Sequence, residues 1–285
     1  MPDSERRSAS RASGAGVRAG ARRRGPAVII WVIAGIALAL LVLPLLGILL
    51  SAPWPQLPAL LVAPETLQAL GLSLLTGVIS TALCLVLGIP LAVVLARSVS
   101  WPVVPRRLLR AAVTIPLVLP PVVGGLALLL LLGRNGVLGK YLALIGVTIP
   151  FTTGAVVIAQ TFVAMPFLVF AVEGALRGAD RRVELAAASL GASPFRVLRT
   201  VTIPLIAPGI AAGAVLCFAR ALGEFGATIT FAGSYPGVTR TLPIASYLAS
   251  QTDLNQSIAL ALVLLVVSVA VLLGLRDRWL PGVRG

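Results

Sequence analysis

The chain has 285 residues, of which 58% are hydrophobic and only 11% are charged, and its mean hydropathy is +1.03. Because a soluble domain has about 25% charged residues, this composition excludes an ordinary water-soluble globule and predicts an all-α membrane protein. The net charge of +14 would suit nucleic-acid binding, but the basic residues lie where a membrane protein places them. The two cysteines lie inside apolar runs and the chain has no histidine, so we expect neither a disulfide framework nor a metal site, and no cofactor.

The first 26 residues are rich in Ser, Gly, Ala and Arg, a composition typical of a disordered basic tail. An apolar run follows over 27–50. A cleaved signal peptide also begins with a basic segment and an apolar core, but that core is typically about 7–15 residues long. We therefore expect the run to be retained as the first membrane span.

A spanning helix needs about 20 predominantly apolar residues. The sequence offers six such runs, so we expect six transmembrane helices within a membrane domain over 27–276, followed by a short tail over 277–285. The runs lie near 27–50, 69–96, 111–133, 153–176, 204–222 and 256–275.

Proline and glycine interrupt three of the apolar stretches. Pro150 separates a short interfacial or re-entrant piece, 142–150, from the fourth span, because proline lacks the amide hydrogen that a helix needs. The stretch 204–233 is too long for one straight helix, and we expect it to bend at Gly223, Gly226 and Gly233. In the third span, Pro116, Pro120 and Pro121 predict a kink, while Gly124 and Gly125 permit close helix approach.

The basic residues predict the orientation of the spans. With the N-terminus inside, the cytoplasmic segments hold all of the 23 Lys and Arg residues except Arg134, Lys140, Arg220 and Arg240. An excess of positive charge in cytoplasmic loops is the usual bias of membrane proteins. We therefore expect a multi-pass protein of the plasma (inner) membrane with both termini in the cytoplasm.

The cytoplasmic loop 180–204 carries closely spaced helix start and stop signals. Asp180 can cap a helix over 181–190, Gly191 can end it in a left-handed turn, and Ser193-Pro194 can start a second helix. The second helix places Arg196 and Arg199 among apolar residues. Two interpretations stay open: a docking element for another protein, or an amphipathic loop packed on its own membrane domain.

The residues of this loop resemble a known motif. The stretch "ELAAASLG", followed by "IPL", is similar to the EAA loop of ABC-transporter permeases, with Leu185 where alanine is more common. The matching positions are Glu184, Ala186, Ala187, Gly191 and Pro204. The resemblance implies a type I ABC importer permease in which this loop couples to a separate ATP-binding subunit, so we expect the chain not to be an enzyme. No GxxxxGK[ST] phosphate loop occurs in the sequence.

Three further stretches resemble the molybdate branch of these permeases: "IPLVLPPVVGGLALLLLLGRNGVLG", "FARALGEFGATITFAG" and "PGVTRTLPIASY". This resemblance implies an oxyanion importer for molybdate, with tungstate not distinguished and the sulfate/thiosulfate permeases as the alternative. It also implies the partners: two ATP-binding subunits, an extracytoplasmic oxyanion-binding protein, a second permease copy forming a homodimer, and membrane lipid, but no nucleic acid.

Six residues are candidates for the translocation pathway: Pro120, Pro121, Gly124, Arg220, Glu224 and Thr228. Arg220 and Glu224 lie four residues apart, so they share a helix face if the helix continues. Either Arg220 attracts the anion and Glu224 orients it, or the two neutralise each other and hold the bend at Gly223.

Two other classes of protein fit the sequence less well. A stand-alone secondary anion transporter would show inverted repeats or several ionisable relays in its spans, and we find only Arg220 with Glu224. A membrane enzyme lacks candidates, because there is no histidine, no metal-ligand cluster and no carboxylate pair deep in a span. We therefore expect no catalytic residues.

Overall fold

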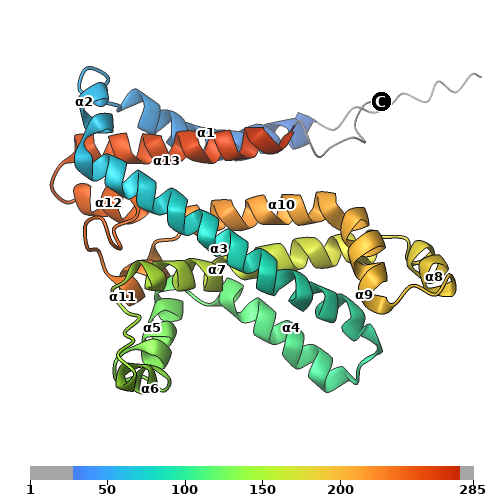
Figure 1. The fold of residues 1–285 in the computed structure, drawn as a ribbon. Helices are drawn as coiled ribbons and strands as arrows, with labels where there is room; N and C mark the ends of the chain where they lie inside the picture. The colour runs from blue at the N-terminus through green and yellow to red at the C-terminus, as the bar shows by residue number, and fades with distance from the viewer. Residues whose placement is uncertain (1–27, 277–285) are drawn as a thin grey trace, which may run out of the picture. The chain divides into compact units, whose positions relative to one another are not determined.

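In the computed structural model, residues 28–276 are described and every regular element among them is a helix (Figure 1). The predicted tails 1–26 and 277–285 lie outside the described residues. The chain divides into two compact units, residues 1–47 and 48–285, and the first helix, α1 (Val28–Leu50), falls mainly in the first unit and is apolar along its whole length. The elements of the second unit are α2 (Leu57–Val62), α3 (Pro64–Arg97), the 3-10 turn η1 (Ser98–Ser100), α4 (Val103–Val118), α5 (Pro121–Leu132), α6 (Gly139–Leu144), α7 (Thr153–Gly178), α8 (Arg181–Ser189), α9 (Pro194–Val197), the π-helical turn η2 (Leu198–Thr202), α10 (Ile203–Leu222), α11 (Gly226–Ala232), α12 (Leu242–Ala249) and α13 (Leu254–Arg276).

Five helices are long and apolar enough to cross a membrane, and the bent pair α4–α5 makes a sixth if it counts as one span. These elements correspond to the six predicted runs, which confirms the all-α membrane fold. The helices begin earlier than predicted at α3 and α4, because Pro64 and Pro102 rather than the first apolar residue mark their starts.

The third span differs from the prediction of a single kinked helix. α4 and α5 meet at an angle of 115°, with Leu119 and Pro120 extended between them. Pro120 and Pro121 follow one another, so two amide hydrogens are missing and the residue ahead of each proline is forced out of the helical region. Two consecutive prolines therefore break this span where a single one, such as Pro116, leaves α4 continuous.

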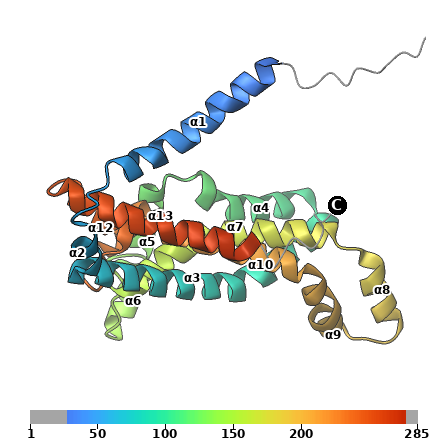
Figure 2. The same ribbon diagram turned by 90° about the horizontal axis from the view of Figure 1, so that it is seen from above.

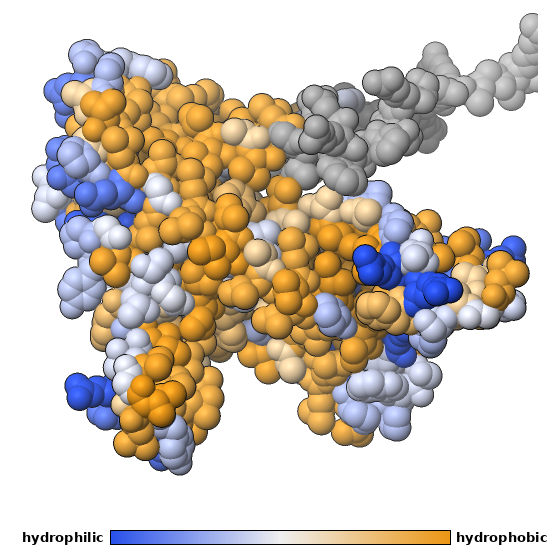
Figure 3. Space-filling model, viewed as in Figure 1, coloured by the Kyte–Doolittle hydropathy of each residue, from blue (hydrophilic) through white to orange (hydrophobic). Residues whose placement is uncertain are grey.

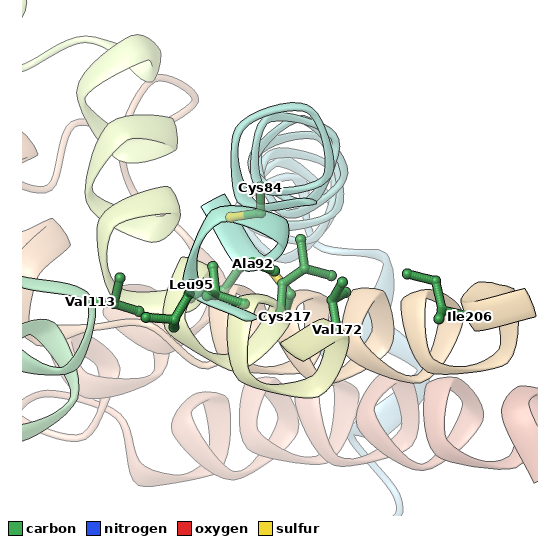
Figure 4. Packing of buried hydrophobic residues seen from close by; sticks show 11 residues of the cluster. Cys84, Ala92, Leu95, Val113, Val172, Ile206 and Cys217 are labelled. Atoms are coloured by element: carbon green, nitrogen blue, oxygen red, sulfur yellow. The ribbon is translucent and has the colours of Figure 1, made fainter. Parts of the chain in front are cut away.

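The core of the second unit is formed by α3, α7 and α10, which lie side by side in both views (Figures 1 and 2). Small residues permit this packing: a Cβ added to Gly213 of α10 would lie 2.9 Å from the Cβ of Ala171 on α7. One cluster of buried residues, which includes Cys84, Leu168 and Cys217, fills the space among the three helices (Figure 4). Both cysteines are free and fully buried, as expected for small apolar side chains.

The predicted interruptions around the core are also present. α10 ends at Leu222, α11 begins at Gly226, and Gly233 ends α11 with a φ of 72°, which confirms the bends predicted in 204–233. Before the fourth span, the short helix α6 ends at Leu144, and Thr152 caps α7 by accepting a hydrogen bond from the amide of Ala155 at 3.2 Å. The stretch after α6 is therefore a break ahead of α7, as Pro150 predicts.

Candidate functional site

The loop between α7 and α10 has the predicted caps. The Asp180 side chain accepts a hydrogen bond from the amide of Arg182 at 2.9 Å, so it caps the first turn of α8. Gly191 has a φ of 84°, the left-handed conformation that ends the helix. Ser193 accepts a bond from the amide of Arg196 at 3.4 Å, and Pro194 occupies the first position of α9.

The second arm of this loop is not a separate helix. α9 continues through the π-helical turn η2 directly into α10, so the segment from Pro194 to Leu222 forms one 29-residue helical stretch. Pro204 explains the wider turn, because it has no amide hydrogen to donate into an ordinary α-helical turn and a π-turn relieves the conflict. The motif is therefore one free helix, α8, followed by an extension of the fifth apolar helix.

Glu184 connects the two arms of the loop. Its Oε1 accepts a hydrogen bond from the hydroxyl of Thr202 at 2.6 Å, and Thr202 is fully buried in η2. The sequence indicated Glu184 as part of a contact surface but contained no signal for this internal bond, because 18 residues separate the partners. The carboxylate therefore fixes α8 to the start of α10.

The outer surface of the loop is apolar and exposed. The exposed fractions of Leu185, Leu190 and Phe195 are 65%, 90% and 71%, and Arg196 is exposed beside Phe195. α8 has no buried residue, whereas Val197 and Thr202 in the second arm of the loop are buried, so the part of the loop that is free of the membrane domain is α8. Figures 1 and 2 both show α8 projecting beyond the ends of α3, α7 and α10. This geometry favours the docking interpretation.

The remaining motif positions lie in the same loop. Ala186 is exposed and Ala187 is half-buried on α8, while Gly191 has open space around its α-carbon. Pro204 is exposed at the start of α10. Because alanine and glycine have small side chains, another protein can approach the backbone of α8 closely at these positions.

α5 and α11 pack closely against each other, and Pro121 is the pathway candidate that lies at this contact. A Cβ added to Gly226 would lie 2.8 Å from the Pro121 ring, and one added to Gly125 would lie 2.6 Å from the carbonyl oxygen of Ala227. Gly124 instead faces Phe162 of α7, at 3.1 Å by the same construction. The close approach predicted for this pair of glycines is confirmed, and Gly125 is the tighter of the two.

Arg220 and Glu224 form an ion pair of 2.7 Å between Nη1 and Oε2, across the bend at Gly223. Glu224 is only 1% exposed, and its other oxygen, Oε1, accepts a bond from the amide of Ala227 at 2.8 Å. The carboxylate therefore also caps α11, which is the geometry expected if the pair holds the bend. Thr228 lies one residue further on, fully buried, and its hydroxyl has no partner among the described residues.

The sequence interpretation missed a second buried carboxylate. Glu173 of α7 is 4% exposed, and its Oε1 contacts both Arg110 of α4, at 2.5 Å, and Arg177 of α7, at 2.7 Å. Arg110 lies one residue ahead of the predicted third span, 111–133, yet it is part of α4, which extends back to Val103. The spacing of Glu173 and Arg177 by four residues in an apolar run was the available signal. In residues 28–276, no group of three metal-ligating side chains occurs.

Comparison with known proteins supplies the context for this geometry. Residues 88–281 match the model of a family described as binding-protein-dependent transport system inner membrane component. The chain is 52% identical over 236 residues to the molybdenum transport system permease protein ModB of Mycobacterium tuberculosis, covering 83% of this chain and 88% of that protein. It is 42% identical over 214 residues to the protein of the same description from Escherichia coli K12, covering 75% and 92%.

A more distant relative has a different description. The probable sulfate transport system permease protein cysT of Nephroselmis olivacea is 33% identical over 214 residues, covering 75% of this chain and 74% of that protein. Among solved structures, a bacterial alginate ABC transporter in complex with its pentasaccharide-bound periplasmic protein matches with a TM-score of 0.66 at 18% identity, covering 87% of this chain and 92% of that one. At that identity, the likeness shows the fold alone.

Proposed function

The chain belongs to the family of binding-protein-dependent transport system inner membrane components, and we propose the following role for it: it is the permease subunit of an ABC importer, and its solute is molybdate. It is a multi-pass membrane protein, with five apolar helices and the bent pair α4–α5. The observation that supports molybdate as the solute is the 52% identity to a molybdenum permease across 83% of the chain. The sulfate alternative has less support, because the sulfate relative is 33% identical.

The loop that carries the motif is the proposed entry point for energy. Leu185, Leu190 and Phe195 present an exposed apolar surface at the tip of the second unit, and Arg196 adds a positive charge at its edge. Exposed apolar residues with a polar rim are typical of a surface that binds another protein. The partner proposed for this surface is a separate ATP-binding subunit, with one copy on each permease of a homodimer, so ATP is hydrolysed outside this chain.

The internal contacts of the loop suggest how movement would reach the membrane. α8 is fixed to η2 by the bond between Glu184 and Thr202, and η2 is continuous with α10. α10 in turn packs closely on α7 through Gly209 and Gly213. A displacement of α8 would therefore move α10 and α7 together, because a packed helix pair transmits strain rather than absorbing it.

Orientation follows from charge in this proposal. The segments 97–110 and 177–203 and both ends of the chain carry most of the basic residues. We therefore place these segments in the cytoplasm and the opposite ends of the spans outside. An extracytoplasmic oxyanion-binding protein would deliver molybdate to that outer side. High-affinity recognition would then lie on the binding protein, and the permease would need only to pass the anion.

Uptake measurements test the proposed function. The permease would be reconstituted in vesicles with its ATP-binding subunit and binding protein, and labelled molybdate uptake would be measured with and without ATP. We expect ATP-dependent uptake that unlabelled molybdate abolishes and that sulfate at the same concentration leaves nearly unchanged. Equal competition by sulfate would overturn the choice of solute, and uptake without ATP would overturn the class of transporter.

A further inference from the structure

A pocket lies where α3, α7 and α8 meet, beside the loop that carries the motif. Its volume is about 630 Å³, and its walls come from the last turn of α3, from η1, from the end of α7 and from the start of α8. Three arginines, Arg97, Arg177 and Arg181, line it together with a single carboxylate, Glu184. Each arginine comes from a different helix, so the pocket gathers positive charge from three elements.

The acidic residues near this pocket are already engaged. Glu184 accepts a hydrogen bond from the hydroxyl of Thr202, and Asp180 caps α8 by accepting one from the amide of Arg182. Glu173 does not line the pocket, but its Oε1 pairs with both Arg110 and the lining residue Arg177, so one negative charge is shared by two guanidinium groups. Within residues 28–276, no carboxylate forms an ion pair with Arg97 or Arg181. The pocket therefore retains an excess of cationic donors.

The apolar residues of the pocket lining indicate what kind of group could be attached to a bound anion. Val93, Val99 and Leu176 contribute apolar surface between the arginines. A single tetrahedral oxyanion fills only a small part of about 630 Å³, so the pocket has room for an anion with an attached apolar body. Trp101, 44% exposed, follows η1 at the end of the α3 span, and tryptophan is enriched at the level of lipid headgroups. In Figure 3, hydrophilic residues gather at this α8–α9 end of the second unit, next to the apolar surface of the spans.

From this arrangement we propose that the pocket binds a phosphate-type oxyanion, supplied by the headgroup of an anionic phospholipid or, with the same chemistry, by a free tetrahedral anion. The planar guanidinium group offers paired donors that match phosphate oxygens. An occupant held by Arg97 and Arg181 would connect the end of the α3 span to the first turn of α8. The lipid or anion would thereby set how firmly α8 is held against the membrane domain.

The test measures binding to the full-length permease and requires neither ATP nor the binding protein, so its failure is distinct from failure of the proposed transport function. Delipidated permease would be titrated with phosphatidylglycerol, with phosphatidylcholine and with inorganic phosphate, and the bound species would be counted by native mass spectrometry. We expect phosphatidylglycerol to bind and the double variant Arg97→Gln, Arg181→Gln to weaken its binding about tenfold or more, because each lost guanidinium removes a charge-assisted contact.

Matched variants separate this pocket from general electrostatics. Arg182→Gln changes the same charge on α8 but lies outside the pocket lining, so it is expected to bind like the wild type. Arg97→Lys with Arg181→Lys keeps the charge and is expected to recover part of the binding, which excludes misfolding as the cause of the loss. Phosphate binding with the same dependence on Arg97 and Arg181, in the absence of lipid binding, would assign the pocket to free oxyanions. Binding of every probe unaffected by the double variant would overturn the proposal.

Discussion

The carboxylate of Glu184 and the hydroxyl of Thr202 lie 2.6 Å apart, and this bond joins the free helix α8 to the π-helical turn at the start of α10. Glu184 belongs to the motif, whereas Thr202 is buried and is not one of the matching motif positions. A motif residue of the candidate docking loop is thus bonded within its own chain. The arrangement suggests that the loop moves as one rigid piece with the fifth apolar helix.

Replacing Thr202 with valine tests this connection, because it keeps the shape of the side chain and removes the hydroxyl. We expect the variant to lose about 1 kcal/mol of stability and to transport less molybdate for each ATP hydrolysed, since α8 is no longer fixed to α10. Uptake and ATP hydrolysis would be measured on the same vesicles. Thr200→Val is the control: its hydroxyl donates only to the carbonyl of Arg196, at 2.7 Å. Unchanged coupling in Thr202→Val would contradict the rigid connection.

Gly191 allows a test of backbone conformation separately from bulk. Its φ is 84°, and an added Cβ would have no neighbouring atom within 4 Å. A side chain therefore meets no clash at this position, but it is disfavoured by the left-handed backbone conformation. We expect Gly191→Val to distort the turn at a cost of about 1–2 kcal/mol and to reduce binding of the ATP-binding subunit, while Gly191→Asn, which tolerates this region, is nearly normal. Co-purification of the two subunits measures the difference. Normal ATP-driven uptake in both Gly191→Val and Glu184→Ala would argue against the coupling role of the loop.

The pair Arg220 and Glu224 permits a test that distinguishes holding a bend from binding the solute. Arg220→Gln leaves a buried carboxylate without its counter-ion, and we expect destabilisation of about 3–5 kcal/mol in thermal unfolding. The double variant Arg220→Gln, Glu224→Gln removes both charges and is expected to recover much of that stability together with uptake. Recovered stability without recovered uptake would instead show that Arg220 acts on the anion.

The contact between α5 and α11 predicts different tolerances at neighbouring glycines. Gly125→Ala would drive a methyl group into the backbone of Ala227 and is expected to cost about 1–3 kcal/mol and to lower uptake. Gly124→Ala meets only the ring of Phe162, a side chain that can shift, and is expected to be milder. Gly71→Ala is the control, because nothing lies within 4 Å of it. Thermal unfolding in detergent ranks the three variants, and a larger loss at Gly124 than at Gly125 would contradict the described packing.

Several features were predictable from the sequence because their physical causes are local. Apolar runs of spanning length predict helices whatever surrounds them, and Asp180, Gly191 and Ser193-Pro194 act on backbone groups within a few residues. The helical membrane fold, the caps of the loop and the bend near Gly223 therefore follow from the amino-acid sequence alone. The i, i+4 spacing of Arg220 and Glu224 also predicted their contact, because the pair spans a single helical turn.

Other features were decided only by the tertiary structure, because their partners are distant in the chain. Arg110 meets Glu173 across 63 residues, and Glu184 meets Thr202 across 18, so no local pattern could pair them. The break of 115° at Pro120 and Pro121 is likewise larger than a kink. The two prolines interrupt the helix locally, but the angle between α4 and α5 depends on how α5 packs against α11. The sequence by itself determined which segments are helices and where their ends are capped. The packing of those helices decided which charges meet and which apolar side chains of the loop stay exposed.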